Sequence, residues 1–408
     1  MTVEKTTLTN RLRVLNINLP DSLSTTIIIM VKAGSRYESK EENGIAHFIE
    51  HTIFKGSSSF PTAQKIAYEI ELLGGQSNAF TTEEYTGYYI KCINENFVPA
   101  FDILSDIFIN PTFDEKELEK EKGVVIEELK MYEDKPEVKV MENFQKGMFD
   151  DDVLGQPIGG MISNISNFSR EMIFDFKNKL YTAQNIVVVI AGNQDKNIVN
   201  DKIKIFEQIK PSGKSYFIQS TGKFSTAESI TKKDIAQTHL MYGSYGLKRN
   251  DPDLTKLLVA TTVMGGGMGS ELYLKLREEL GIAYYVYSGI ETFEDRGLVY
   301  VSAGVDSSRM SEAVDGIKKV IDTLIEKEIS SDSLKRAKEL IKTELTLDFE
   351  SSDDIAEYLG KREVILGEYK LPTQIKHEIE QVTVEDVKNI LQRLWTSTHL
   401  EVITTNKN

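Results

Sequence analysis

The chain has 408 residues, of which 40% are hydrophobic and 27% charged, and its formal net charge is −15. A length of this order predicts two or three domains, at roughly 150 residues each, with an ample apolar core. Because 63 acidic residues outnumber 48 basic ones, the chain has no general electrostatic attraction to nucleic acid or anionic lipid, and we expect neither as a partner.

The sequence contains no recognisable targeting or membrane-spanning segment. The first ten residues, MTVEKTTLTN, lack a basic n-region and an apolar h-region. The longest apolar runs, 27–31 and 186–192, are far shorter than the ~20 residues needed to span a bilayer. The single cysteine, Cys92, cannot form an internal disulfide, so the chain needs no oxidising compartment. We therefore expect a soluble, cytoplasmic protein.

Two of the five histidines stand four residues apart in the segment 43–56, which has a helical, apolar-flanked pattern. His47, Glu50 and His51 form an H-x-x-E-H motif, in which both imidazoles lie on one face of a helix and can reach one ion. A catalytic zinc site needs three protein ligands and an open position for water. Glu50 is the candidate general base, because a nearby carboxylate can activate a zinc-bound water by taking its proton. The alternative is that both histidines are polar residues at the edge of a core.

A helix over 63–73 is predicted to end at two glycines, after which the chain forms two strands within 74–92. The first of these strands, in GGQSNAFT, is short and polar. An edge strand exposes unpaired backbone groups, with which an extended peptide can pair as an added strand. The alternative is an ordinary hairpin strand with a turn asparagine.

Two helices separated by a proline break are predicted within 98–130. In the second of them, Glu121 and Glu128 are seven residues apart, which is two turns, and therefore share a face. This segment is the best candidate for the source of a third metal ligand. Glutamates on a helix commonly form a solvated face instead, and their spacing alone does not decide between the two interpretations.

The second half of the chain repeats the order of elements in the first. Residues 208–229 are rich in Pro, Gly, Ser and Lys, which is the composition of a linker. Beyond them, 281–304 has a two-strand pattern and 311–346 a helix pair, whose leucines and one glutamate match the first helix pair at an offset of 216. We predict an α+β fold of two homologous domains, 1–207 and 230–408, each a mainly antiparallel β-sheet packed with α-helices.

A glycine cluster at 265–267 precedes a predicted helix over 270–280, with Gly281 as its stop. A phosphate-binding loop is rejected here, because no GK[ST] sequence follows and the segment has no βαβ context. Arg277 lies in the last turn of this helix and Tyr284 in the strand that follows. Taken alone, they read as a salt-bridging helix residue and a half-buried strand residue.

H-x-x-E-H is the signature of the inverzincins, and the chain resembles the pitrilysin-like zinc metallopeptidases. This is the family of pitrilysin, insulysin and the mitochondrial processing peptidase, and the likeness is to its two-domain, bacterial-type members. The segments VKAGSRYE (31–38), FKGS (54–57) and ELLGGQSNAFTT (71–82) also resemble sequences of that family. The resemblance covers most of the chain.

The resemblance implies Zn²⁺ as the cofactor and assigns its ligands. Three residues are implied to bind the ion: His47, His51 and, after the family's spacer of 76 residues, Glu128. Glu50 is implied to be the general base, which makes 1–207 the catalytic domain. Glu121, at a further acidic position of the family, is implied to orient a ligand or to tune its charge.

The resemblance also implies residues that bind the substrate. Asn78 and Ala79 are implied to hold it beside the scissile bond. Arg277 and Tyr284, seven residues apart as in the family, are implied to bind substrate backbone and to stabilise the oxyanion. One departure is Glu271, which stands where the family often has arginine, and which we expect to alter substrate preference at most.

Together these observations predict a zinc-dependent endopeptidase that hydrolyses extended or unfolded peptides. Larger relatives enclose the substrate with four such domains, like a clam shell, so a two-domain chain supplies half of the enclosure. We therefore expect a homodimer, in which Arg277 and Tyr284 complete the site of the partner subunit. Two alternatives stay open: a non-catalytic partner subunit of a processing-peptidase-like complex, and a zinc-bearing protein that binds peptides without cutting them.

Overall fold

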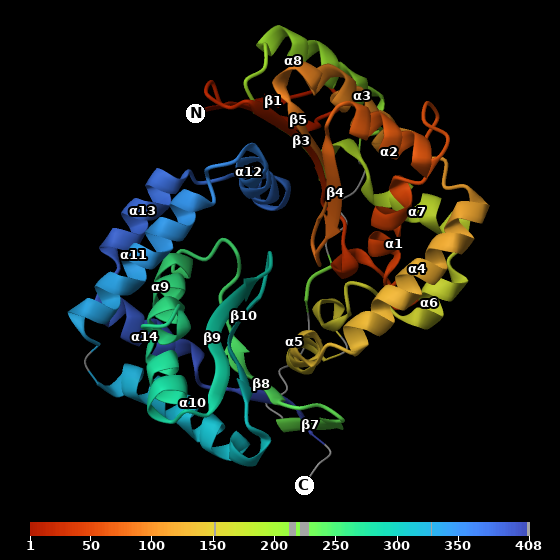
Figure 1. The fold of residues 1–408 in the computed structure, drawn as a ribbon. Coiled ribbons are helices and arrows are strands. Elements are labelled where there is room, and N and C mark those ends of the chain that lie inside the picture. Colours follow the sequence, from red (N-terminus) through yellow and green to blue (C-terminus); the bar gives the residue numbers. More distant parts are fainter. Residues whose placement is uncertain (151, 212–217, 221–227, 328, 406–408) are drawn as a thin grey trace. The chain divides into compact units, whose positions relative to one another are not determined.

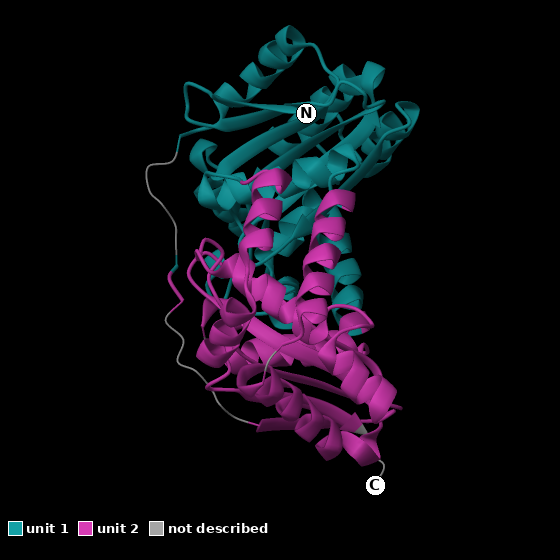
Figure 2. Ribbon diagram, turned by 90° about the vertical axis from the view of Figure 1, so that its left-hand side faces the viewer, with its two compact units in different colours: residues 1–130, 156–218, 348–369 teal, residues 131–155, 219–347, 370–408 magenta. Residues whose placement is uncertain are grey.

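The computed structural model describes residues 1–150, 152–211, 218–220, 228–327 and 329–405. The chain divides into two compact units, each with its own β-sheet (Figure 2). The first unit comprises residues 1–130, 156–218 and 348–369, and the second comprises residues 131–155, 219–347 and 370–408. One boundary between them, after Ile218, falls within the expected linker 208–229, most of which lies outside the described residues.

The sheet of the first unit has six strands in the order β1-β2-β6-β3-β5-β4. The strands are β1 (Thr2–Thr7), β2 (Arg13–Asn18), β3 (Ser24–Val31), β4 (Gln76–Thr81), β5 (Thr86–Ile93) and β6 (Ile186–Gly192). All neighbours pair antiparallel apart from β2 and β6, which are parallel. β4 is an edge strand, so one side of its backbone is left without a partner in this sheet.

Helices cover both faces of this sheet (Figure 1). They are α1 (Ile45–Ile53), α2 (Ala63–Leu72), α3 (Phe97–Ile109), α4 (Glu115–Glu133), α6 (Ile162–Asn167), α7 (Arg170–Leu180), α8 (Lys196–Lys202) and α12 (Ser352–Leu366). β3 and β6 are continuous apolar runs because both of their faces are buried. On one face Ile27 and Ile29 pack in the core with α1 and α3. On the other, Met30 and Val189 face Gly360 of α12.

The second unit repeats this plan with a five-stranded sheet in the order β7-β11-β8-β10-β9. Its strands are β7 (Glu228–Lys233), β8 (Thr238–Tyr245), β9 (Ala283–Thr292), β10 (Gly297–Val305) and β11 (His399–Thr405). Its α-helices are α5 (Pro136–Phe149), α9 (Leu254–Gly265), α10 (Met310–Glu326), α11 (Ser331–Leu347), α13 (Pro372–Gln381) and α14 (Val384–Leu394). β7 and β11 are parallel and the other pairs antiparallel, as in the first unit from β2 to β4. The predicted α+β fold of two homologous domains is thus confirmed.

Each unit includes a helix from the other half of the sequence. α5 precedes the linker but packs on β8 and β11 of the second unit, whereas α12 follows it and packs on β3 and β6 of the first. α12 begins at Ser352 and α5 at Pro136, an offset of 216 that also separates the starts of α4 and α11. The exchange is therefore reciprocal between equivalent helices, and sequence periodicity does not predict it.

The predicted helix ends are confirmed, and one predicted helix differs in type. Gly74 and Gly281, the predicted stops, adopt left-handed backbone with φ of 60° and 62°. The helix expected over 270–280 is in its main part a π-helix, η6 (Tyr273–Glu279), a form that α-helical periodicity does not distinguish. Short 3-10 turns complete the described elements: η1 (Ser35–Tyr37), η2 (Asn94–Asn96), η3 (Val153–Gly155), η4 (Ala183–Asn185), η5 (Ile203–Gln208) and η7 (Ser307–Arg309). Among the described residues, no helix has both the length and the apolarity to cross a bilayer.

Candidate metal centre

Helix α1 carries the H-x-x-E-H motif and packs against the sheet with its other side. Its apolar residues, Ile45, Phe48, Ile49 and Ile53, are buried in the core of the first unit. Residues three and four apart share a helix face, so this packing turns the histidines and the glutamate of the motif toward α4 and β4. All three of these polar residues are half-buried.

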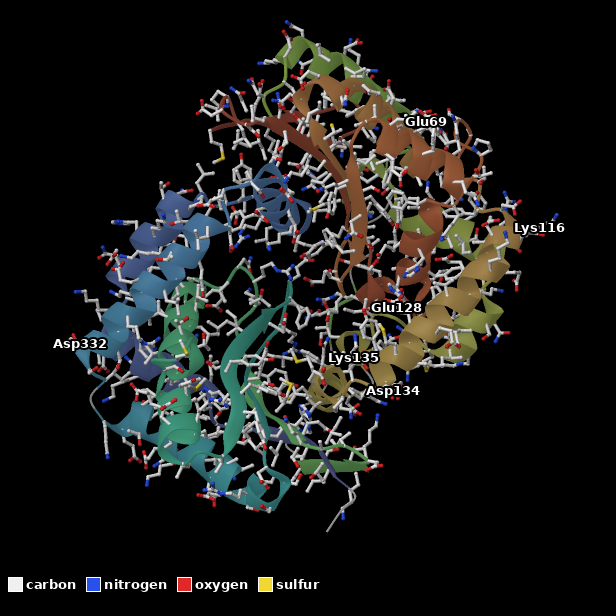
Figure 3. The ribbon with its side chains drawn as sticks, viewed as in Figure 1. Glu69, Lys116, Glu128, Asp134, Lys135 and Asp332 are labelled. Carbon is white, nitrogen blue, oxygen red and sulfur yellow. The ribbon has the colours of Figure 1, made fainter. Side chains whose placement is uncertain are left out.

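His47, His51 and Glu128 form a cluster whose potential ligand atoms all lie within 4.8 Å of one another. Oε2 of Glu128 is 3.1 Å from Nε2 of His51 and 4.0 Å from Nε2 of His47. The two imidazole rings are edge to face, with their centroids 4.6 Å apart. Glu128 lies on α4, on the side that faces α1 (Figure 3). Imidazole nitrogen and carboxylate oxygen bind zinc at ~2.0–2.2 Å, so ligands of one ion lie within ~4 Å of each other. The two distances from Glu128 meet this limit, and two imidazoles with one carboxylate are a donor set that fits zinc.

Glu121 lies behind the ligand cluster and contacts one of its histidines. Its Oε1 accepts a hydrogen bond from Nδ1 of His51 at 3.1 Å, and its Oε2 pairs with Nζ of Lys55 at 2.7 Å. Burial raises the pKa of Glu121, but the hydrogen bonds from His51 and Lys55 outweigh it and lower that pKa. A proton held on Nδ1 leaves the lone pair of Nε2 for a metal, which is the usual arrangement of a zinc-binding histidine.

The two histidines differ in their affinity for protons. Burial and the neighbouring charge of His51 lower the pKa of His47 to about 4, so the His47 imidazole is neutral at neutral pH. Burial also lowers the pKa of His51, but the hydrogen bond to Glu121 and the charges of Glu128 and Glu50 outweigh it and raise that pKa. A metal must therefore compete with a proton mainly at His51.

Glu50 lies beside the cluster and is held by the edge strand. Thr81, the last residue of β4, donates a hydrogen bond from its Oγ1 to Oε2 of Glu50 at 2.6 Å. Burial raises the pKa of Glu50, against the hydrogen bond from Thr81 and the charge of His51, which lower it. A raised pKa moves a carboxylate toward the range in which it works as a general base near neutral pH.

The chain matches two sequence families that together span this cluster and most of the second half. The family "Insulinase (Peptidase family M16)" matches residues 13–161, and "Peptidase M16 inactive domain" matches residues 167–341. The "Uncharacterized zinc protease YmxG" of Bacillus subtilis is 35% identical, over 97% of this chain and 96% of the relative. The chain belongs to peptidase family M16.

Solved structures share the fold across the whole chain. A structure described as a peptidase M16 inactive domain from Pseudomonas fluorescens has a TM-score of 0.91 at 18% identity, and covers 100% of this chain and 99% of that one. A protease from Helicobacter pylori has a TM-score of 0.90 at 21% identity, and covers 99% of each chain. The predicted family is therefore confirmed, and its members include proteins named zinc proteases.

A cleft of about 370 Å³ opens next to the cluster in this M16 chain. Both apolar side chains and polar groups of the motif line it. The lining residues are Glu50, His51, Phe54, Lys55, Ala63, Ile66, Ala67, Ile70, Ser77, Asn78, Ala79 and Glu121. Asn78 and Ala79 therefore lie where α1, α2 and β4 meet. Asn78 uses its Oδ1 to accept a hydrogen bond from the backbone N–H of Ala79 at 2.9 Å.

Arg277 and Tyr284 belong to the second unit, and their share in a common site with the metal cluster stays a prediction. Nη1 of Arg277 donates hydrogen bonds to the carbonyl oxygens of Ala283 (2.8 Å) and Tyr284 (2.6 Å). Arg277 thus fixes the start of β9, the edge strand, with part of its guanidinium. The side chain of Tyr284 is exposed.

Two residues of the site, Lys55 and Thr81, were not singled out from the sequence. Lys55 stands four residues after His51, so helical spacing could have placed it on the ligand face. Thr81 depends on the packing of β4 against α1, which no local pattern encodes.

Proposed function

We propose that the protein is a zinc-dependent endopeptidase that cuts extended or unfolded peptides. The observation that carries the proposal is the convergence of His47, His51 and Glu128 with the carboxylate of Glu50 beside them. A zinc ion held by the three ligands supplies Lewis acidity and lowers the pKa of a bound water. The ligand set leaves the fourth position for that water.

Glu50 serves as the general base in this mechanism. Its carboxylate takes the proton of the water that attacks the peptide carbonyl, and then passes the proton to the leaving amine. Its raised pKa favours both transfers, because a carboxylate whose pKa is closer to neutral pH both accepts a proton and releases it again. Thr81 holds Oε2 of Glu50, which fixes the direction of the carboxylate.

The substrate pairs with the free edge of β4 as an added strand. Backbone hydrogen bonds to the edge are independent of side-chain identity, so they suit peptides in extended conformation and exclude folded segments. Alternate side chains of such a peptide point to one face. We propose that one of them enters the cleft beside Asn78 and Ala79, whose apolar lining residues, among them Ile66 and Ile70, favour an apolar residue next to the scissile bond.

Cleavage of a quenched-fluorescence peptide library tests this function. Wild type should cleave, a chelator should abolish the activity, and added Zn²⁺ should restore it. E50Q should keep its zinc and lose at least about 100-fold in kcat, as expected when a general base is removed. The matched control is E127Q, because Glu127 lies next to Glu128 on α4 but is exposed. Undiminished cleavage by E50Q would show that Glu50 is not the base.

We further propose that two copies of the chain form the active enzyme, with Arg277 and Tyr284 completing the site of the partner subunit. The exposure of Tyr284 on the edge strand β9 and the pairing of complementary halves in the family support this. Both side chains can donate hydrogen bonds to the oxyanion and to substrate backbone.

Mixing two inactive variants distinguishes a shared site from a site within one chain. In a heterodimer of E50Q with Y284F, one of the two sites combines an intact Glu50 with an intact Tyr284 only if the residues act between subunits. Random reassociation should then restore about a quarter of wild-type activity. A mixture that stays inactive although heterodimers form, or an active monomer, would exclude the arrangement.

A further inference from the structure

A buried carboxylate lies at the start of the site helix. Glu38, directly after the turn η1, is 1% exposed. Its Oε1 accepts a hydrogen bond from the backbone N–H of Ala46 at 2.8 Å. Its Oε2 accepts one from the backbone N–H of Gly44 at 2.8 Å and another from Nδ2 of Asn43 at 3.0 Å. Both oxygens are therefore bound to the residues that open α1.

These bonds do the work of a helix cap that α1 does not have itself. The first N–H groups of an α-helix lack partners within the helix, and a Ser, Thr, Asp or Asn side chain at the N-cap commonly accepts from one of them. The N-cap of α1 is Gly44, which has no side chain and a φ of 100°. Glu38 supplies the acceptors from nine residues before His47. The last N–H group that it binds, that of Ala46, directly precedes His47 in the chain.

The same corner is tied to a loop of the first unit, residues 156–160. Nδ2 of Asn43 donates a second hydrogen bond to the carbonyl oxygen of Pro157 at 3.0 Å. Gly44 packs so tightly here that a Cβ on it would lie 2.9 Å from the carbonyl oxygen of Gly159. A Cβ on Gly159 would in turn lie 4.0 Å from Nδ1 of His47. Nδ1 is buried and has no hydrogen-bond partner in the described part of the chain, so the ring depends on this packing for its orientation.

We propose that Glu38 is a positioning residue of the metal centre. By capping α1 and tying it through Asn43 to the loop, Glu38 fixes His47 in the orientation that brings its Nε2 to Glu128. The inference rests on the zinc binding proposed above. Glu38 touches neither a ligand atom nor the substrate, so its loss should weaken the binding of the metal more than it slows cleavage by the zinc-loaded protein.

Zinc affinity of the full chain tests this role. E38Q replaces one acceptor oxygen by an amide group that cannot accept, so at least one of the three bonds is lost. The control is E41Q, because Glu41 lies in the same segment but is exposed. Competition with a chromophoric chelator should show about 10–100-fold weaker zinc binding by E38Q, the usual cost of losing a partner outside the ligand set. E41Q should bind as wild type does, and zinc-saturated E38Q should keep a kcat near that of wild type.

Circular dichroism establishes that each variant is folded at the temperature of the titration. If E38Q does not fold, N43A provides the measurement. It keeps the bonds from the backbone N–H groups of Gly44 and Ala46 to Glu38 and removes both hydrogen bonds of Nδ2, to Glu38 and to Pro157; it should weaken zinc binding several-fold. Unchanged affinity in the folded variant would overturn the role of Glu38 and leave the proposed function intact. A wild-type chain that binds no zinc would overturn the proposed function itself, and this inference with it.

Discussion

Helix α1 of the first unit and helix α9 of the second hold equivalent positions in the order of elements along the chain. Each follows a central strand, β3 or β8, and precedes the hairpin that contains the edge strand, β4 or β9. α1 carries His47, Glu50 and His51 on its exposed side. α9, with the sequence LTKLLVATTVMG, has Lys256 as its one ionisable residue and is buried over most of its length. The equivalent helix in the second unit thus serves packing alone.

The helices α4 and α11 differ in the same way. At the offset of 216 residues, the buried Glu121 of α4 corresponds to Ala337 of α11, which is also buried. Glu128 corresponds to Glu344, which is exposed. Among the described residues, His47, His51 and Glu128 are the one group that could hold a metal. The second unit forms the equivalent sheet without this group of side chains. We therefore expect that the side chains of the site can be changed with little loss of structure.

The largest expected effect follows from exchanging the two equivalent glutamates for glutamine. E128Q removes a charged ligand and should lower zinc affinity by at least about 100-fold, the upper end of what losing an outer partner costs. E344Q makes the same chemical change at the equivalent position of the second unit and should leave zinc affinity and cleavage unchanged. Equilibrium dialysis with metal analysis measures both variants. A similar loss in the two would mean that the units do not differ in the way described.

A smaller effect, on the free energy of unfolding, is expected from substitutions in α12 and α5. Each of these helices packs in the unit formed mainly by the other half of the sequence. A Cβ on Gly360 of α12 would lie 2.8 Å from Sδ of Met30, and one on Gly147 of α5 would lie 2.6 Å from Nε2 of His399. G360A and G147A should each lower the free energy of unfolding by about 1–3 kcal/mol through overpacking. Denaturant unfolding of the zinc-loaded protein measures this.

Gly123 provides the control for those two substitutions. It is also helical, in α4, but a Cβ there would meet no atom within 4 Å. G123A should therefore stabilise the protein by about 0.5–1 kcal/mol, because alanine is the better helix former. If G360A and G147A stabilise the protein as G123A does, the exchanged helices are not packed as described.

A pH-dependent effect is expected from the Glu38 cap of α1, to which α9 has no counterpart. Burial raises the pKa of Glu38 to about 7 from an ordinary 4.5, against the N–H donors of Ala46 and Gly44. The folded state therefore binds this proton more tightly than the unfolded state, and the free energy of unfolding should fall as the pH rises from about 4.5 to about 7. The slope for one proton is at most about 1.4 kcal/mol per pH unit. Urea unfolding across this range should show the slope in wild type and its loss in E38Q.

The N-cap of α9 gives the contrasting case. Asp253 makes no side-chain hydrogen bond to the backbone of its helix, and hydrogen bonds from Lys256 lower its pKa below the ordinary 3.8. Asp253 therefore makes its full contribution to the free energy of unfolding above its unfolded pKa of about 3.8, and this contribution does not change between about pH 4.5 and pH 7, where Glu38 titrates. D253N should leave the slope between about pH 4.5 and pH 7 as it is in wild type. A slope that disappears in D253N and persists in E38Q would reverse the assignment.

Features that depend on local spacing could be predicted from the sequence. The four-residue spacing of His47 and His51 and the seven-residue spacing of Glu121 and Glu128 place these groups on helix faces, which is where the structure has them. The internal repeat predicted two sheets of one plan. That Glu128 and not another acidic residue joins the histidines came from the family spacing rather than from periodicity.

Features that depend on contacts distant in sequence could not be predicted. The exchange of α5 and α12 needs knowledge of which sheet face each helix buries, and both helices have ordinary amphipathic patterns. The bond from Thr81 to Glu50 joins residues 31 apart in the chain.

Anomalous diffraction at the zinc edge, from crystals of the zinc-loaded chain, tests the central claim most directly. We expect one strong peak per chain, in the first unit between α1 and α4, at about 2.0–2.2 Å from Nε2 of His47, Nε2 of His51 and a carboxylate oxygen of Glu128. The second unit should hold no equivalent peak. A zinc ion bound elsewhere with this cluster empty, or one bound between α9 and α11, would contradict the account.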